Sequence, residues 1–137
     1  MKKLAVIYHS AHGHTEHIAR HVAQAAGSVA ATEVHVLEVE DLTMAPEVLV
    51  TYDGLILGSP TYLGGVSGQF KTFMDSTGPM WRNQQLKGKL AAGFTVSSLP
   101  GGGQAVDADV DVDFLHAARN DLGRKPLHAR AAPGSPL

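Results

Sequence analysis

A short segment near the amino terminus combines the residue types that bind phosphate: Ser10, Ala11, His12, Gly13, His14 and Thr15. Hydroxyls and imidazoles offer hydrogen-bond donors, and Gly13 permits a positive φ or a close approach. The segment lacks Gly-Lys-Ser/Thr and Gly-x-Gly-x-x-Gly, so it is neither a Walker loop nor the dinucleotide fingerprint. An ordinary strand-to-helix turn capped by Thr15 is the alternative, and local sequence leaves both interpretations open.

Two further segments have a composition that suits a ligand. Residues 58–65, Gly-Ser-Pro-Thr-Tyr-Leu-Gly-Gly, contain Pro60, which stiffens the chain, and Tyr62, which offers an aromatic face. Residues 97–104, Ser-Ser-Leu-Pro-Gly-Gly-Gly-Gln, would offer backbone donors. Each segment alone is compatible with an ordinary loop. Three such segments at one edge of a sheet are much stronger grounds for a binding site.

The elements between these segments predict that shared edge. Continuous apolar runs at 4–8, 55–57 and 90–96 indicate buried strands, and Val34, Val36 and Val39 indicate another. A helical pattern covers Thr15–Ala26, with Ile18, Val22 and Ala25 inward and Gly27 as its stop, and 46–52 is a connector with helical character. Ser67 is expected to cap a helix over 68–74, with Phe70, Phe73 and Met74 inward. Alternating strands and helices predict an α/β fold with a parallel sheet, whose ligands bind at the carboxyl ends of the strands.

The composition narrows the function classes. The chain has 137 residues, 44% hydrophobic and 18% charged, which predicts one globular domain. A net charge of −2 gives no basic field for nucleic acid, and we expect no nucleic-acid partner. The sequence has no Cys, no signal-peptide core and no apolar run near the roughly 20 residues of a membrane span. We therefore expect a cytoplasmic protein without a membrane span.

Two clusters raise the question of a metal site. His14, His17 and His21 share one helical face, but a solvated polar face is favoured over metal binding because no carboxylate completes the set. The acidic run Asp107, Asp109 and Asp111 lacks the Gly and the closing Glu of a calcium loop. We predict no metal site. The single Trp, Trp81, precedes a polar run and is expected in an exposed segment with a binding role rather than in the core.

The order of the motifs resembles one family closely. They are Ser10-x-x-Gly13-His14; Gly58-Ser59-Pro60-Thr61 with Gly64, Ser67, Gly68 and Gln69; 73–78 leading to Trp81; Gly88-Lys89-Leu90-Ala91; and Gly101-Gly102-Gly103-Gln104. Over about residues 3–104 the chain resembles the WrbA-type NAD(P)H:quinone oxidoreductases of the flavodoxin-like superfamily. The resemblance implies a three-layer sandwich with a parallel sheet of order 2-1-3-4(-5).

The resemblance also implies a cofactor and its contacts. The family binds FMN, takes electrons from NADH or NADPH, reduces quinones by two-electron hydride transfer and forms homo-oligomers, dimers or tetramers. No side chain need act as a nucleophile. His12 and Trp81 would lie near the substrates, and Tyr62 and Leu63 replace a frequent Arg-Phe pair. The implied flavin-binding residues are Ser10, Ala11, His12, Gly13, His14, Thr15, Pro60, Thr61, Tyr62, Leu63, Gly64, Ser97, Ser98, Leu99, Pro100, Gly101 and Gly102.

The chain departs from the family after Gln104. No fifth buried strand is readable in residues 105–137, so we expect a truncated flavodoxin-like domain over 1–104 and a divergent, poorly packed tail. Permitted codons for 106–113 and 117–133, shifted by one base, spell a segment like the missing family sequence, which suggests a frameshift. Two alternative functions follow: a one-electron flavodoxin-type carrier, and a truncated remnant with impaired flavin binding.

Overall fold

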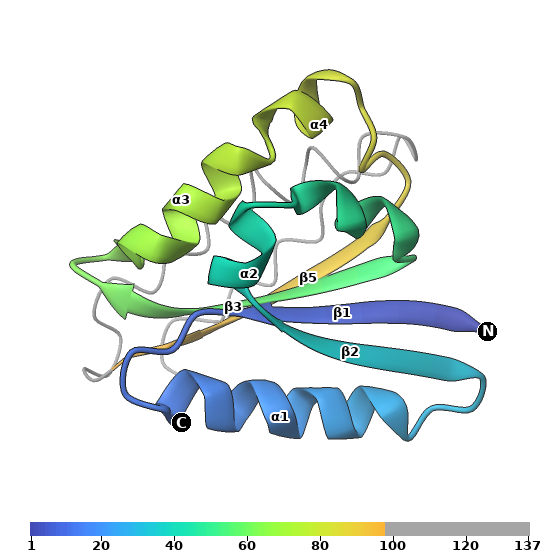
Figure 1. Cartoon of the computed structure of the whole chain (residues 1–137). Coiled ribbons are helices and arrows are strands. Elements are labelled where there is room, and N and C mark those ends of the chain that lie inside the picture. Colours follow the sequence, from blue (N-terminus) through green and yellow to red (C-terminus); the bar gives the residue numbers. More distant parts are fainter. Residues whose placement is uncertain (98–137) are drawn as a thin grey trace, which may run out of the picture.

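The computed structural model describes residues 1–97 and shows a parallel sheet at the centre of the molecule (Figure 1). Its strands follow the order β2 (Thr32–Glu38), β1 (Lys2–Tyr8), β3 (Gly54–Tyr62), β5 (Leu90–Val96). A two-residue strand, β4 (Gly65–Val66), pairs antiparallel with the end of β3. This order confirms the predicted flavodoxin-like sheet, with β5 as the fourth parallel strand.

Helices cover both faces of the sheet. The helix α1 (His14–Gly27) packs against β1 and β2 on one face. The other face carries α2 (Val39–Thr43), the 3-10 helix η1 (Pro46–Thr51), α3 (Gly68–Ser76) and α4 (Gly78–Arg82). In Figure 1, α1 lies below the sheet and α2, α3 and α4 lie above it. The described part of the chain is therefore a three-layer α/β sandwich.

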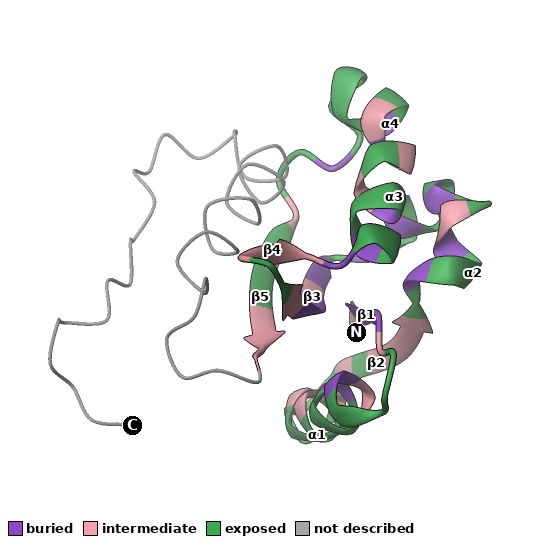
Figure 2. Ribbon diagram, turned by 90° about the vertical axis from the view of Figure 1, so that its left-hand side faces the viewer, coloured by how far each residue is buried: buried purple, intermediate pink, exposed green. Residues whose placement is uncertain are grey.

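Strand β1 explains why both faces need cover. Its side chains alternate: Ala5 and Ile7 join the cluster under α2 and α3, whereas Val6 and Tyr8 join the cluster under α1. The first cluster is the larger and contains Phe70 and Phe73 of α3. Figure 2 shows buried residues along β3 and on the sheet-facing sides of α2 and α3.

The predicted cap of α3 is confirmed. Ser67 precedes the helix in an extended conformation, and its Oγ accepts a hydrogen bond from the Phe70 backbone N–H at 3.2 Å. As predicted, Phe70 and Phe73 are buried, and Met74 is partly buried against the same cluster. Among residues 1–97, no helix is long and apolar enough to span a membrane.

Some predicted details of α1 and β2 are wrong. Ile18 and Ala25 are exposed, and α1 instead buries Thr15 and Ala19. Small residues on that face let the helix lie close to the sheet, which apolar periodicity alone does not reveal. Val39 begins α2 rather than extending β2, and it is buried from the helix side.

The predicted loop after residue 57 is also wrong in part, because β3 continues to Tyr62. Gly58 and Pro60 suggested a loop, since both residues usually interrupt strands. Here Gly58 pairs with Phe94 of β5, whose ring lies over it. A Cβ on Gly58 would lie 2.1 Å from the Phe94 ring, so the close approach of two strands requires glycine.

Candidate functional site

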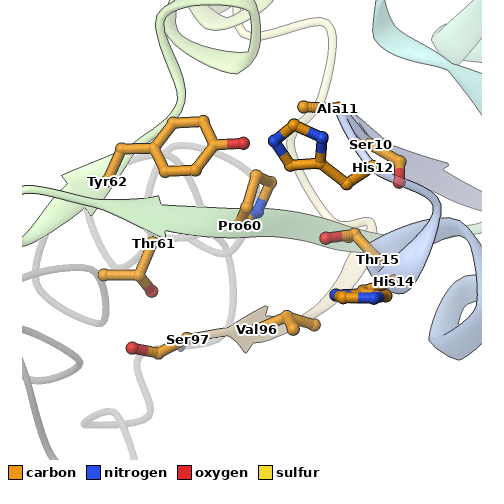
Figure 3. Close-up of a pocket in the computed structure, with 10 residues that line it drawn as sticks. All are labelled: Ser10, Ala11, His12, His14, Thr15, Pro60, Thr61, Tyr62, Val96 and Ser97. Carbon is orange, nitrogen blue, oxygen red and sulfur yellow. The ribbon is translucent and has the colours of Figure 1, made fainter. Parts of the chain in front are cut away.

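The first and second predicted segments and the start of the third meet at one pocket. It lies at the carboxyl ends of β1, β3 and β5 and has a volume of about 320 Å³ (Figure 3). Ligands of parallel sheets bind at this edge. The lining residues are Ser10, Ala11, His12, His14, Thr15, Pro60, Thr61, Tyr62, Val96 and Ser97.

The start of α1 has free backbone donors. Gly13 is the N-cap with φ 90°, a left-handed conformation, and no side chain caps the helix. The Gly13 N–H itself is taken by Ser10 Oγ at 3.0 Å, which tightens the turn before the helix. The alternative of a turn capped by Thr15 is therefore wrong. The first-turn N–H groups and the positive end of the helix dipole remain available to an anion.

Thr15 strengthens the case for a ligand at this end. Its residue is only 3% exposed, yet it lines the pocket, and its hydroxyl oxygen points into the pocket in Figure 3. That hydroxyl makes no hydrogen bond to any residue that the structure describes. The hydroxyl is therefore available to donate a hydrogen bond to a ligand oxygen in the pocket.

The mouth of the pocket is flanked by two rings. Figure 3 shows Tyr62 from β3 and His12 from the first segment on opposite sides, with Pro60 between them. Tyr62 is 44% exposed, so its ring has a free face. A flat aromatic molecule would fit between these walls, because stacking on such rings is favourable.

The far wall comes from β5. The parallel pairing of Pro60 with Val96 places Ser97 beside the end of β3. Thr61 and Thr95 share a hydrogen bond between their Oγ1 atoms at 2.5 Å, which links the two strands below the pocket. Val96 was missed by the sequence reasoning, which took the loop alone as the lining. The strand register would have revealed it, because the last residue of a strand lies beside the loop that follows.

Several predicted site residues lie elsewhere. Leu63 and Gly64 form the turn between β3 and β4, with φ values of 50° and 79°, and do not line the pocket. Trp81 lies on α4 and is 61% exposed, as predicted, but it does not line the pocket either. The remaining predicted residues, Ser98, Leu99, Pro100, Gly101 and Gly102, lie outside the described residues.

Charges around the pocket are sparse. No Asp, Glu, Lys or Arg is among its described lining residues. Glu16, in the first turn of α1, is paired with Arg20 at 2.8 Å. Behind the first segment, His9 is 4% exposed, its Nε2 lies 3.6 Å from Glu40 Oε1, and its Nδ1 has no partner in the described part of the chain.

The histidines of α1 do not assemble a metal site in residues 1–97. His17 and His21 have ring centroids 4.5 Å apart and are exposed, as expected for a solvated face. No group of three or more His, Cys, Asp or Glu side chains in this range is arranged to hold a metal ion.

This three-layer α/β protein, with a pocket at the carboxyl edge of its sheet, has known relatives. The model of the flavodoxin domain family matches residues 5–129. The chain therefore belongs to the flavodoxin domain family. The match extends beyond residue 104, where the resemblance read from the sequence ends.

Solved structures support this assignment. A flavodoxin, WrbA-like protein from Agrobacterium tumefaciens is 29% identical with a TM-score of 0.72, covering 87% of this chain and 75% of that one. Flavodoxin 2 from Bacillus cereus is 30% identical with a TM-score of 0.65, covering 85% and 77%. The NAD(P)H:(acceptor) oxidoreductase FerB from Paracoccus denitrificans is 27% identical with a TM-score of 0.61, covering 87% and 74%.

Proposed function

We propose that the chain binds FMN in this pocket and acts as an NAD(P)H:quinone oxidoreductase of the WrbA type. The observation that carries the proposal is the Thr15 hydroxyl, which faces the pocket beside the uncapped start of α1. These groups suit a phosphate, and the space between Tyr62 and His12 suits a flat ring system. The names of the similar structures, a WrbA-like protein and an NAD(P)H oxidoreductase, support the same class.

Each end of FMN has matching residues in the proposal. Ser10, Thr15 and the N–H groups of α1 would bind the phosphate, and Pro60, Thr61 and Tyr62 would border the isoalloxazine. Ser97 and the residues up to Gly102 would hold its pyrimidine side. FMN supplies hydride and electron transfer when bound. The protein would orient the ring, supply donors along its edge and exclude water, so no nucleophilic side chain is needed.

The second substrate would approach from the open side of the pocket. His12 stands at the mouth, where NADH or NADPH and then a quinone would bind. Trp81 is exposed and lies away from the pocket lining, so it would reach a quinone only across an interface between two copies of the chain. We therefore propose a homo-oligomer working in the cytoplasm, with Trp81 completing the substrate site of a neighbouring copy.

A one-electron carrier is the second candidate. The 30% identity to Flavodoxin 2 from Bacillus cereus favours it. Electron carriers of this kind tend to be strongly acidic for docking, whereas this chain has a net charge of only −2, which favours the oxidoreductase. The third candidate is a truncated remnant with impaired flavin binding. In this candidate, a domain over residues 1–104 is followed by a divergent tail. Sequencing the gene across codons 104–107 tests the frameshift.

An FMN titration of the full chain, followed by flavin fluorescence, tests the proposal. We expect saturable quenching with micromolar or tighter affinity, then oxidation of NADH or NADPH that depends on added quinone. Riboflavin, which lacks the phosphate, is the matched control and should bind more weakly. A folded chain that does not bind FMN would contradict the proposal and favour the remnant. FMN binding without quinone reduction would favour the electron carrier.

A further inference from the structure

Imidazoles are the side chains that can bring positive charge to the described lining of the pocket. His12 and His14 stand among Ser, Thr, Ala, Pro, Val and Tyr side chains, without a Lys or Arg. A phosphate monoester carries close to two negative charges above its second pKa of about 6. Backbone N–H groups and hydroxyls donate hydrogen bonds but carry no net charge. The described lining therefore leaves charge compensation to two side chains that ordinarily change charge between pH 5 and 8.

We propose that His14 and His12 provide the charge for a phosphate dianion in this pocket, so that binding takes up protons and favours phosphate monoesters. The proposal rests on the proposed function, because the monoester is the phosphate of FMN. An anion beside an imidazole favours its protonated form, and protonation favours the anion in return. Phosphate affinity and the protonation of these two histidines are thus one coupled equilibrium.

The neighbouring charged groups do not replace this role. On α1, Arg20 is held by Glu16, and the next histidine, His17, packs against His21. On the side of α2, Glu40 lies 3.6 Å from His9, behind the first segment.

The other two walls carry no formal charge near neutral pH. The lining residues of β3 are Pro60, Thr61 and Tyr62, and those from the end of β5 are Val96 and Ser97. The Glu16–Arg20 ion pair has no net charge, so it adds none to the pocket. The described walls therefore leave charge compensation to His12 and His14.

The coupling gives a ligand preference that depends on pH. An imidazole whose pKa a bound dianion raises by one unit changes the affinity by about tenfold over its titration. From pH 7 to pH 8.5, where free FMN is already the dianion, we expect FMN affinity to fall about tenfold. Riboflavin carries no phosphate, and its affinity should change less than about twofold over the same range.

Calorimetric titration of the full chain with FMN measures the proton uptake directly. The titration is run at pH 7.5 in two buffers with different ionisation enthalpies, because the difference in heat then counts the protons taken up. The variants are His14→Gln, His12→Gln and the double variant with both changes, which keep hydrogen-bonding ability without the charge. His21→Gln is the matched control, because His21 lies on the same helix, exposed and outside the pocket lining.

The outcomes separate this proposal from the proposed function. We expect wild type and His21→Gln to take up protons with FMN, each pocket variant to take up fewer, and riboflavin to give none. FMN binding with equal proton uptake in wild type and in the variant lacking both pocket imidazoles would overturn the histidine role and leave FMN binding intact. A folded chain that binds neither FMN nor riboflavin would overturn the proposed function, and this proposal with it.

Discussion

Polar groups at the two ends of the sheet differ in whether they have hydrogen-bond partners within the protein. At the amino end, Asp53 Oδ2 accepts a hydrogen bond from the Lys3 backbone N–H at 2.9 Å. Lys89 Nζ donates to the Val50 carbonyl at 2.9 Å. His35 is held on both ring nitrogens, by the Tyr52 hydroxyl and by Glu33 Oε1, each at 2.7 Å. These polar groups have partners inside the protein, and all of these bonds except the one between His35 and Glu33 connect different elements of the fold.

At the carboxyl end, several polar groups lack partners among the described residues. The Thr15 hydroxyl points into the pocket, no side chain caps α1, and His9 Nδ1 is buried without a hydrogen bond. His9 Nδ1 is a buried atom without a partner among residues 1–97, and the Thr15 hydroxyl and the start of α1 face the pocket, so this edge is where a ligand would find free polar groups. The comparison separates residues that hold the fold from residues that are available to a ligand.

The largest effect is expected in the core, which serves both ends equally. Phe73→Ala removes a fully buried ring between α3 and the sheet and should lower the free energy of unfolding by about 3–5 kcal/mol. Urea unfolding measures this loss. The exposed Met44→Ala change is the control and should stay within about 0.5 kcal/mol. The FMN affinity of the folded fraction should be unchanged. A changed affinity would contradict the distinction between residues that stabilise the fold and residues that bind the ligand.

Thr15→Val tests an unpaired group at the carboxyl end. The change keeps the shape and removes the hydroxyl, so FMN affinity should fall about tenfold, as expected for one hydrogen bond to a charged group. Stability without ligand should stay the same or rise. Thr43→Val is the opposite control, because the Thr43 hydroxyl donates to the Val39 carbonyl at 2.8 Å. A loss of stability in Thr15→Val with unchanged FMN binding would mean that its hydroxyl serves the fold.

The order of the sheet and the edge that carries the pocket could be predicted from the sequence. Continuous apolar runs at 4–8, 55–57 and 90–96 indicate buried parallel strands, and parallel strands bring the loops after them to one edge. The Ser67 cap was also readable, because its signal is local. These features depend on short stretches of sequence and on rules that all parallel sheets obey.

Features that depend on contacts between distant residues could not be read. Gly58 looks like a loop residue until the ring of Phe94 is placed over it by the pairing of β3 with β5. Thr15 looks like a helix cap, but Gly13 is the N-cap of α1, which leaves the Thr15 side chain for the pocket. Val96 lines the pocket because the pairing of β3 with β5 places it beside Pro60. Local sequence carries no record of such pairings.

Tyr8 is an exception in the comparison of the two sheet ends, because it lies at the carboxyl end of β1 but its hydroxyl has a hydrogen-bond partner within the protein. Its hydroxyl donates to Glu38 Oε1 at 3.0 Å, and burial, then this hydrogen bond, raises the Tyr8 pKa to about 12. Tyr8→Phe should lower stability at pH 7 by about 1 kcal/mol and leave FMN affinity unchanged.

The raised pKa of Tyr8 determines how the stability difference between wild type and Tyr8→Phe should change with pH. A raised pKa in the folded state stabilises the fold below the unfolded value of about 10, and the benefit disappears as pH rises towards 12. The stability difference between wild type and Tyr8→Phe should therefore shrink between pH 10 and pH 12, as followed by urea unfolding. A difference that stays constant over this range would mean that the hydroxyl ionises equally in both states.

The smallest effect is expected at the amino end, for Asp53→Asn. The hydrogen bond from the Lys3 backbone N–H holds the pKa of the Asp53 carboxyl below its usual range. A lowered pKa stabilises the fold above the unfolded value of about 4, and this benefit is lost as pH falls through the folded value. Wild type should thus be slightly more stable than Asp53→Asn at pH 7 and equal to it in strong acid, as measured by thermal midpoints.

The effect is small because the amide oxygen of the substituted side chain can still accept the hydrogen bond from the Lys3 N–H, although without the charge. Asp75→Asn is the control, since Asp75 is exposed and pairs only along α3 with Lys71 at 2.6 Å, a surface ion pair of little value. FMN affinity should be the same in wild type and both variants. A weaker affinity in Asp53→Asn would show that the β1–β3 junction at the amino end positions the first segment across the length of the sheet, and the two ends would then act as one unit.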